Sequence, residues 1–312
     1  AQLKLFIGDQ YEEPGYSAYD NCDGDISDRV HTDSRVDFNQ AGTYEIIYTV
    51  SDSHGNETSL SRSVQILENP LNVKLEYNHD LFDNTSFEWW FDKSQAHARN
   101  TAAKSADWLK TYGAYYIGPD EKVIYLTFDE GGNDITYIKQ IADVLNEYEV
   151  KATFFLTRNY IRDKADFVRD LVKHGHVIGN HSWHHYDMTT LANAQQVDAF
   201  VEELTQEEKT YLEVVGEPMP KIFRFPRGGC SERAMKMVCD LGYLTYFWSH
   251  AYYDYGSDVS EEEALKTMMD HYHNGAIYLL HPSNKGNWEA LDDFIREMKR
   301  LGYRFDTVDH IG

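Results

Sequence analysis

Two adjacent carboxylates, Asp129 and Glu130, end the apolar run YLTF and stand directly before two glycines. Like charges this close together repel each other unless a cation neutralises them. The segment NHSWHH begins at residue 180 and places His181 and His185 four residues apart, so that one helical turn would aim both imidazoles the same way. Two histidines and one carboxylate form a three-ligand set that leaves a coordination position for water, as catalytic zinc requires.

An H-x-x-x-H pair alone is a weak signal, because surface and core histidines produce the same spacing. His184 is an alternative ligand, although its ring would point away from His181 in most turn geometries. The pair gains weight because an acidic pair follows a predicted strand elsewhere in the same chain. Together the two signals favour a metal site.

Bound water at such a site has its pKa lowered towards about 7, which makes hydroxide available at neutral pH. Hydrolysis also needs a base for the proton of the water and an acid for the leaving group. Asp129 and His281 both follow predicted strands and suit these two roles. Arg224 could pair with Asp129 and hold it ionised, and Asp254 could pair with His281 and keep it protonated.

From about residue 122 onward, apolar runs alternate with amphipathic segments. This alternation indicates the strands and helices that must position these residues. The predicted strands are 123–128, 151–156, 176–180, 221–225, 244–248 and 276–280. This pattern predicts an α/β fold with a parallel sheet, in the form of a distorted (β/α) barrel of about seven or eight strands. In such a barrel the reactive residues lie at the carboxyl ends of the strands.

The N-terminal part differs in character and predicts a small all-β domain. Its runs GTYEIIYTVSD and SLSRSVQIL are rich in strand-forming residues, and the D-G-D-I segment ahead of G-T-Y resembles bacterial immunoglobulin-like repeats. Asp20, Asp23 and Asp25 could bind calcium or form a solvated turn, and the turn is favoured because their spacing is not that of an EF-hand. The expected domains are an Ig-like sandwich over 1–70, a connecting segment of the catalytic domain over 71–121, and the barrel over 122–312.

The composition excludes several classes of protein. A net charge of −23 argues against binding to nucleic acid or to an anionic membrane surface. No apolar run reaches about 18 residues, so we expect no transmembrane segment. Three cysteines make no disulfide framework. No signal peptide is visible, and we expect the mature form of a secreted, monomeric protein that acts outside the cell or at the cell wall.

The segments TFDEG, HSWHH, RFPRG, WSHAYYDY and LLH occur in this order. Their order and spacing resemble the polysaccharide deacetylases of the NodB-homology type, carbohydrate esterase family four, over about residues 84–310. RFPRGGCSE, AIYLLHPSNKGNWEALDDFI and the upstream FEWWFDKSQAHARN look closest to one branch. That branch contains the peptidoglycan N-acetylmuramic acid deacetylases, which are associated with the muramic δ-lactam of spore cortex.

The resemblance implies a role for each of the residues singled out. Asp129 would be the general base and His281 the general acid, supported by Arg224 and Asp254. The implied metal ligands are Glu130, His181 and His185, and the implied substrate-binding residues are Arg227, Leu279, Tyr255 and Trp248. The backbone N–H of Arg227 would stabilise the oxyanion. The implied cofactor is one divalent ion, for which we expect zinc, with cobalt, nickel or manganese as alternatives. The implied partner is a peptidoglycan glycan strand.

The chain departs from the usual family pattern at four positions. Glu130 replaces an aspartate, Arg227 a tyrosine, Tyr255 a tryptophan, and Ala251 an aspartate often found three residues before Asp254. A guanidinium could pair with the free lactyl carboxylate of muramic acid, so Arg227 predicts a preference for N-acetylmuramoyl units. A deacetylase of peptidoglycan N-acetylglucosamine or of chitin-like polymers is an alternative, as is a catalytically silent glycan-binding wall protein.

Overall fold

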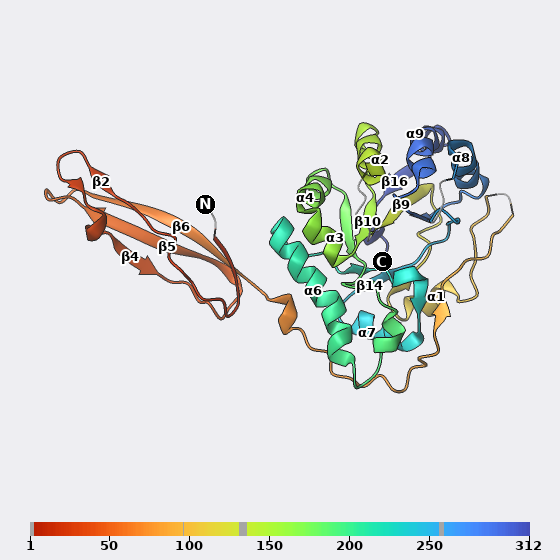
Figure 1. The fold of residues 1–312 in the computed structure, drawn as a ribbon, viewed down its shortest axis with the longest axis horizontal. Coiled ribbons are helices and arrows are strands. Elements are labelled where there is room, and N and C mark those ends of the chain that lie inside the picture. Colours follow the sequence, from red (N-terminus) through yellow and green to blue (C-terminus); the bar gives the residue numbers. More distant parts are fainter. Residues whose placement is uncertain (1–2, 96, 131–135, 256–258) are drawn as a thin grey trace. The chain divides into compact units, whose positions relative to one another are not determined.

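The computed structural model describes residues 3–95, 97–130, 136–255 and 259–312. The chain divides into two compact units, residues 1–72 and 73–312 (Figure 1). Each unit has its own buried hydrophobic cluster, and the second unit contains two such clusters. Among the described residues, no helix is both long and apolar enough to cross a membrane. The cysteines Cys22, Cys230 and Cys239 are all free, as expected.

The first unit is a β-rich domain whose main sheet has the strand order β1-β6-β5-β4. Its elements are β1 (Leu3–Phe6), β2 (Tyr19–Asp20), β3 (Gly24–Asp25), η1 (Ser27–Arg29), β4 (His31–Ser34), β5 (Gly42–Ser51), β6 (Glu57–Leu67) and η2 (Pro70–Asn72). Strands β5 and β6 form a long antiparallel pair. Ile46 and Tyr48 of β5 are buried while Glu45 and Ile47 are exposed, because neighbouring side chains of a strand point to opposite faces.

The D-G-D-I segment forms a turn. Asp20 Oδ1 accepts two backbone N–H groups of the turn that follows it, each at 2.8 Å. Asp23 pairs with Arg29 at 2.7 Å, and Asp25 accepts the N–H of Ser27 at 2.9 Å. In the described part of the chain, no group of three or more His, Cys, Asp or Glu side chains could hold a metal ion. The hydrogen bonds within the segment and the Arg29 ion pair therefore describe a turn closed by its own side chains.

The second unit is built on one parallel sheet of eight strands. Seven of them follow the order β15-β9-β10-β11-β12-β14-β8, and β16 pairs with β9. The strands are β8 (Ala114–Tyr115), β9 (Val123–Glu130), β10 (Thr153–Leu156), β11 (Val177–Asn180), β12 (Ile222–Phe223), β14 (Leu244–Tyr246), β15 (Ala276–Leu280) and β16 (Arg304–Asp306). All six strands expected from the apolar runs are present, whereas β8 and β16 were not predicted. A half-barrel of parallel strands confirms the predicted fold class.

Helices cover the outside of this sheet (Figure 1). They are α1 (Ala106–Lys110), α2 (Thr136–Glu147), α3 (Arg158–Asp163), α4 (Ala165–Lys173), α5 (Met188–Leu191), α6 (Val197–Val215), α7 (Glu232–Asp240), α8 (Glu261–Asp270) and α9 (Lys285–Arg300). The shorter elements are β7 (Phe87–Glu88), which pairs with β13 (Gly229–Cys230), and the turns η3 (Pro226–Gly228) and η4 (Val308–His310).

Every residue of β9 is buried, as is usual for a strand with helices on one side and a barrel interior on the other. Leu126 and Phe128 join the cluster that includes side chains of α2 and α9, whereas Val123 and Tyr125 join the other large cluster. The barrel is distorted, since among the described residues an isolated bridge and no ladder links the β8 side to β15.

Candidate active site

A cavity of about 690 Å³ is lined by most of the residues that the sequence singles out. These are Asp129, Glu130, His181, His185, Arg227, Trp248, Tyr255, Leu279 and His281. Arg224 and Asp254 are buried and do not line the cavity, but each contacts a residue that does. The structure therefore gathers all the predicted site residues around one space.

The register of the sheet explains this gathering. Leu156 of β10 is aligned with both Glu130 of β9 and Asn180 of β11, and Asn180 is aligned with Phe223 of β12. The ends of four parallel strands therefore lie at one level, as the barrel prediction requires. The residues that follow β11 and β12 at this level are His181 and Arg224.

Arg224 is fully buried and holds Asp129 by a charged hydrogen bond. Its Nη1 donates to Asp129 Oδ1 at 2.7 Å and to Thr127 Oγ1 at 2.7 Å. Its Nε donates to the carbonyl of Tyr246 at 2.8 Å, and Nη2 donates to that of Phe247 at 3.2 Å. These fixed partners orient the guanidinium, so its charge faces the carboxylate permanently.

The balance of charges keeps Asp129 ionised. Burial acts to raise the pKa of this carboxyl, but the charge and the hydrogen bond of Arg224, with further contributions from His181 and His281, outweigh burial and leave the pKa below its usual value. An ionised carboxylate at the edge of the cavity can accept a proton from water. Asp129 is therefore equipped as a general base.

His281 is held by a buried carboxylate from another segment. Asp254 Oδ1 lies 2.6 Å from His281 Nδ1, Asp254 Oδ2 accepts the His281 backbone N–H at 2.7 Å, and Asn287 donates to the same oxygen at 2.6 Å. Burial acts to lower the pKa of His281, but the hydrogen bond and charge of Asp254, with the charges of Asp129 and Glu130, raise it overall. A protonated imidazole at the cavity can donate a proton.

The two histidines of the NHSWHH segment stand next to each other, with ring centroids 4.9 Å apart. His181 Nδ1 donates to the carbonyl of Arg224 at 2.9 Å, which leaves Nε2 without the proton and 3.7 Å from Asp129 Oδ2. Burial lowers the pKa of His181, and burial is also the main reason why the pKa of His185 falls to about 4. Both rings are thus neutral at pH 7.

The chemistry of these donors fits a divalent cation. Neutral imidazoles are metal ligands. A protein usually orients such a ring through a hydrogen bond from the ring nitrogen that does not bind the metal, as His181 Nδ1 would be here. The carboxylates Asp129 and Glu130 are both buried and border the imidazoles. A complete sphere is not formed, because the described residues contain no group of three donors arranged to hold an ion.

The loop that carries the histidines is not helical, so the predicted helical turn is wrong. Instead Ser182 and His185 adopt left-handed backbone angles, with φ of 70° and 60°. Arg227, on the facing loop, has a φ of 57°. Each such residue costs about 1–3 kcal/mol and persists only where surrounding contacts impose it. Here Ser182 Oγ accepts the His185 N–H at 3.0 Å, which closes the turn.

Helix α6 supplies the contacts that hold this loop. Glu203 accepts both the backbone N–H of His184, at 2.9 Å, and its ring Nδ1, at 2.5 Å. The Trp183 N–H donates to the Glu203 carbonyl at 2.9 Å, and Glu207 accepts the His181 N–H at 3.3 Å. Burial raises the pKa of Glu207 well above its usual value, so this acid is neutral.

The sequence did not reveal this support. The segment VEELTQEEKT, residues 201–210, is typical of a solvated helix face. In the structure, however, Glu203 and Glu207 of this segment are buried. His184, the alternative ligand, is instead stacked between Trp183 and Tyr186, with centroids 4.1 and 4.9 Å away. The only available signal was a spacing of four residues between the glutamates, which repeats on one side of a helix.

Aromatic side chains surround the cavity. Trp89 is 2% exposed and its indole N–H donates to the carbonyl of Trp248 at 2.9 Å, whereas Trp90 is 55% exposed. Tyr255 is half exposed and its ring meets the edge of His281 at 5.3 Å. Trp89 thus serves packing, and Trp90 and Tyr255 offer faces on which a sugar ring can stack.

Arg227 and Leu279 bring a charged and an apolar side chain to the cavity wall. The Arg227 side chain is exposed, and none of the ion pairs among the described residues includes it. Among the described residues, this guanidinium therefore has no structural carboxylate partner. Leu279 is buried and offers an apolar wall beside His281.

Comparisons with known proteins indicate the family of each unit. Residues 117–246 match the family model of polysaccharide deacetylases, and residues 1–66 match that of the bacterial surface protein Ig-like domain. The chain is 37% identical over 234 residues to the peptidoglycan-N-acetylmuramic acid deacetylase PdaA of Bacillus subtilis, a match that covers 73% of this chain and 86% of that protein. The solved structure of PdaA, a family 4 carbohydrate esterase, superimposes with a TM-score of 0.68 over 73% of this chain and 97% of that one.

Two further relatives differ from PdaA in the function that their names state. A peptidoglycan-N-acetylglucosamine deacetylase of Bacillus cereus is 29% identical over 204 residues, which covers 64% of this chain and 92% of that protein. A family 4 pseudoenzyme from Bacillus anthracis has a TM-score of 0.58 at 26% identity, over 64% of this chain and 68% of that one.

Proposed function

This chain belongs to the polysaccharide deacetylase family, carbohydrate esterase family 4, and we propose that it removes the acetyl group from N-acetylmuramic acid units of peptidoglycan. Two of its relatives carry the names of peptidoglycan deacetylases, which hydrolyse amide bonds. The observation that carries the proposal is the pairing of Arg224 with Asp129 and of Asp254 with His281 around one cavity. One pair prepares a base and the other prepares an acid.

In the proposed reaction Asp129 accepts the proton of the attacking water. Its lowered pKa keeps it ionised and available at neutral pH. His281, with a raised pKa, donates a proton to the sugar nitrogen as the amide bond breaks. The two groups reach the same substrate because both line the cavity.

The proposed cofactor is one divalent ion, with zinc favoured, held by His181, His185 and Glu130. When bound, such an ion polarises the amide carbonyl and acidifies water. The two neutral imidazoles and the buried Glu130 support this assignment. Together with the ion, the backbone N–H of Arg227 would stabilise the developing oxyanion, and such a donor contributes about 3–4 kcal/mol where it has been removed.

The choice of muramic acid over glucosamine rests on Arg227. Muramic acid carries a lactyl group, whose free carboxylate matches an exposed guanidinium in charge and geometry. Trp248, Tyr255 and Leu279 would hold the sugar and the acetyl methyl. We propose that the protein acts at the cell wall as a secreted monomer, because the proposed substrate is a cell-wall polymer.

Two alternatives compete with this function. Action on N-acetylglucosamine is the nearer one, since a relative carries that name. A silent glycan-binding protein is the other, since a pseudoenzyme is also a relative. The retained base, acid and supporting residues favour a working enzyme.

The test is acetate release from muropeptides by the full chain with added zinc or cobalt, compared with a sample treated with chelator and with Asp129→Asn. Acetate released only by the metal-supplied wild type supports a metal-dependent hydrolase. Mass spectra of the digested product then show which sugar has lost its acetyl group. Binding without acetate release would favour the silent protein, and loss from glucosamine alone would refute the muramic assignment.

A further inference from the structure

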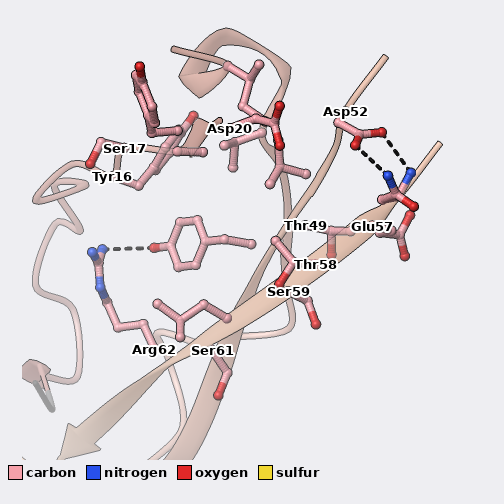
Figure 2. A pocket seen from close by; sticks show the side chains of 18 of the residues that line it. Tyr16, Ser17, Asp20, Thr49, Asp52, Glu57, Thr58, Ser59, Ser61 and Arg62 are labelled. Atoms are coloured by element: carbon pink, nitrogen blue, oxygen red, sulfur yellow. Dashed lines mark hydrogen bonds between the residues drawn. The ribbon is translucent and has the colours of Figure 1, made fainter. Parts of the chain in front are cut away.

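A second cavity, of about 620 Å³, lies in the first unit between strands β5 and β6 and residues 15–20 (Figure 2). Pockets that hold small organic ligands usually measure about 300–1,000 Å³. Tyr16 and Tyr48 both line the cavity, and their ring centroids lie 5.3 Å apart. The Ig-like unit therefore contains a space large enough for a sugar unit or two.

Exposed apolar side chains concentrate at this cavity. The described part of the first unit has four large apolar side chains that are exposed, and three of them line this space. They are Tyr16, Tyr19 and Leu60, which are 47%, 80% and 76% exposed. The fourth, Ile47, lies outside it. Tyrosines beside hydroxyl groups such as that of Ser59 suit pyranose rings, which have apolar faces and polar edges.

Among the described residues that line the cavity, Arg62 is the one Lys or Arg, and it is already engaged. Arg62 donates to Tyr48 Oη at 2.8 Å and to the carbonyl of Gly15 at 2.9 Å, and it forms an ion pair with Glu13. The pKa of Glu13 is lowered to about 2, because its hydrogen bonds to Tyr11, Tyr48 and Arg62 outweigh the effect of burial. Arg62 thus stabilises the fold of this unit, and its charge is already neutralised by Glu13, so that it would attract an anionic ligand only weakly.

The remaining charges of the cavity wall are negative. Asp20, Asp52 and Glu57 all line it, with Asp52 and Glu57 at the end away from Arg62 in Figure 2. Residues 1–72 contain four Lys or Arg against thirteen Asp or Glu, so the whole unit is acidic. This field repels polyanions and attracts cations.

The cavity also lies away from the connection to the second unit. It is lined by the first half of β6, from Glu57 to Arg62, whereas the connecting segment follows Leu67 at the other end of that strand. At about 3.3 Å per residue, the strand residues that line the cavity lie roughly 17–33 Å along β6 from Leu67. A ligand can therefore enter without displacing the chain that joins the units.

From these observations we propose that the Ig-like unit binds glycan strands through this cavity and prefers amino sugars whose nitrogen is a free ammonium. Tyr16 and Tyr19 would contact the sugar faces, and Asp52 and Glu57 would face the ammonium. The inference rests on the proposed function in one respect, since deacetylation produces such amines. Bound product would then tether the enzyme to the strand and raise the local concentration of further substrate.

Binding of three soluble oligosaccharides to the full chain tests the proposal by calorimetry. These are a β-1,4-linked glucosamine oligomer with free amines, its N-acetylated counterpart, and an anionic oligomer with carboxylate groups. We expect the free-amine oligomer to bind best, and Tyr16→Ala and Tyr19→Ala each to weaken it about fivefold to tenfold. Tyr16→Phe, which keeps the ring, should retain most of the affinity, and raised salt should weaken binding.

Ile47→Ala is the matched control, because it removes an exposed apolar side chain of the same unit outside the cavity. It should bind as the wild type does. Equal affinities for Tyr16→Ala, Tyr19→Ala and Ile47→Ala would overturn the site, and equal binding of the acetylated oligomer would overturn the amine preference. The glucosamine oligomer has no acetyl group to lose, so this result is independent of acetate release, which the tyrosine variants should retain on small muropeptides.

Discussion

Arg224 and Asp129, 95 residues apart in the chain, meet at 2.7 Å where two parallel strands end, and both are buried. A buried ion pair survives when hydrogen bonds satisfy the rest of each group. Arg224 meets this condition through Thr127 and two backbone carbonyls. The pair links the stability of the barrel to the ionisation of the proposed base.

Arg224→Met should therefore reduce both stability and activity. Removal of one partner from a buried ion pair costs about 3–5 kcal/mol, which thermal unfolding would detect. Without the guanidinium, burial dominates and the pKa of Asp129 rises. Since the base works when ionised, the acid limb of the pH–rate profile should move to higher pH. Arg224→Lys, which keeps the charge, should show a smaller shift, and an unmoved limb in Arg224→Met would contradict the role of Arg224.

Asp254→Asn should act on the other limb. The carboxylate of Asp254 raises the pKa of His281 against the effect of burial, so its loss lowers that pKa. The acid works only when it is protonated. The alkaline limb of the pH–rate profile should therefore lie at lower pH in the variant than in the wild type. A pH–rate profile measures this, with the surface variant Asp270→Asn as control. An unchanged alkaline limb would show that another group donates the proton.

Glu203→Gln should weaken metal binding although Glu203 lies outside the proposed ligand set. This residue holds both the backbone and the ring of His184, next to His185. Loss of such supporting contacts lowers metal affinity by about 10–100-fold. Competition with a chromophoric chelator measures the affinity for zinc, and excess zinc should restore activity if the fold is intact. Glu202→Gln, an exposed neighbour on the same helix, should have no effect.

Arg227→Tyr should change which sugar is preferred. If the guanidinium pairs with the lactyl carboxylate, the variant should lose rate on muramoyl substrates relative to glucosaminyl substrates by about tenfold or more. The ratio of kcat/KM on the two substrates is the measurement. Arg227→Lys should give a ratio between that of the wild type and that of Arg227→Tyr. Unchanged relative rates would show that Arg227 does not select the sugar.

Local patterns in the sequence were sufficient for the repeating strands and for the polar residues after them. Apolar runs report burial within a few residues, and reactive groups such as Asp129, His181 and His281 follow those runs directly. Parallel strands end at one edge of a barrel. The position of each group directly after a predicted strand was therefore enough to expect that these groups lie together.

Only the tertiary structure decided how the histidines and their supports are arranged. The loop at His181 adopts left-handed angles in place of a helical turn, because contacts from α6, some 20 residues away in the chain, hold it. Glu203 and Glu207 resemble a solvated helix face in sequence, and only packing against the barrel makes them buried partners. Local periodicity reports which residues are buried, but pairing between distant groups depends on sheet register and helix packing, which no short segment encodes.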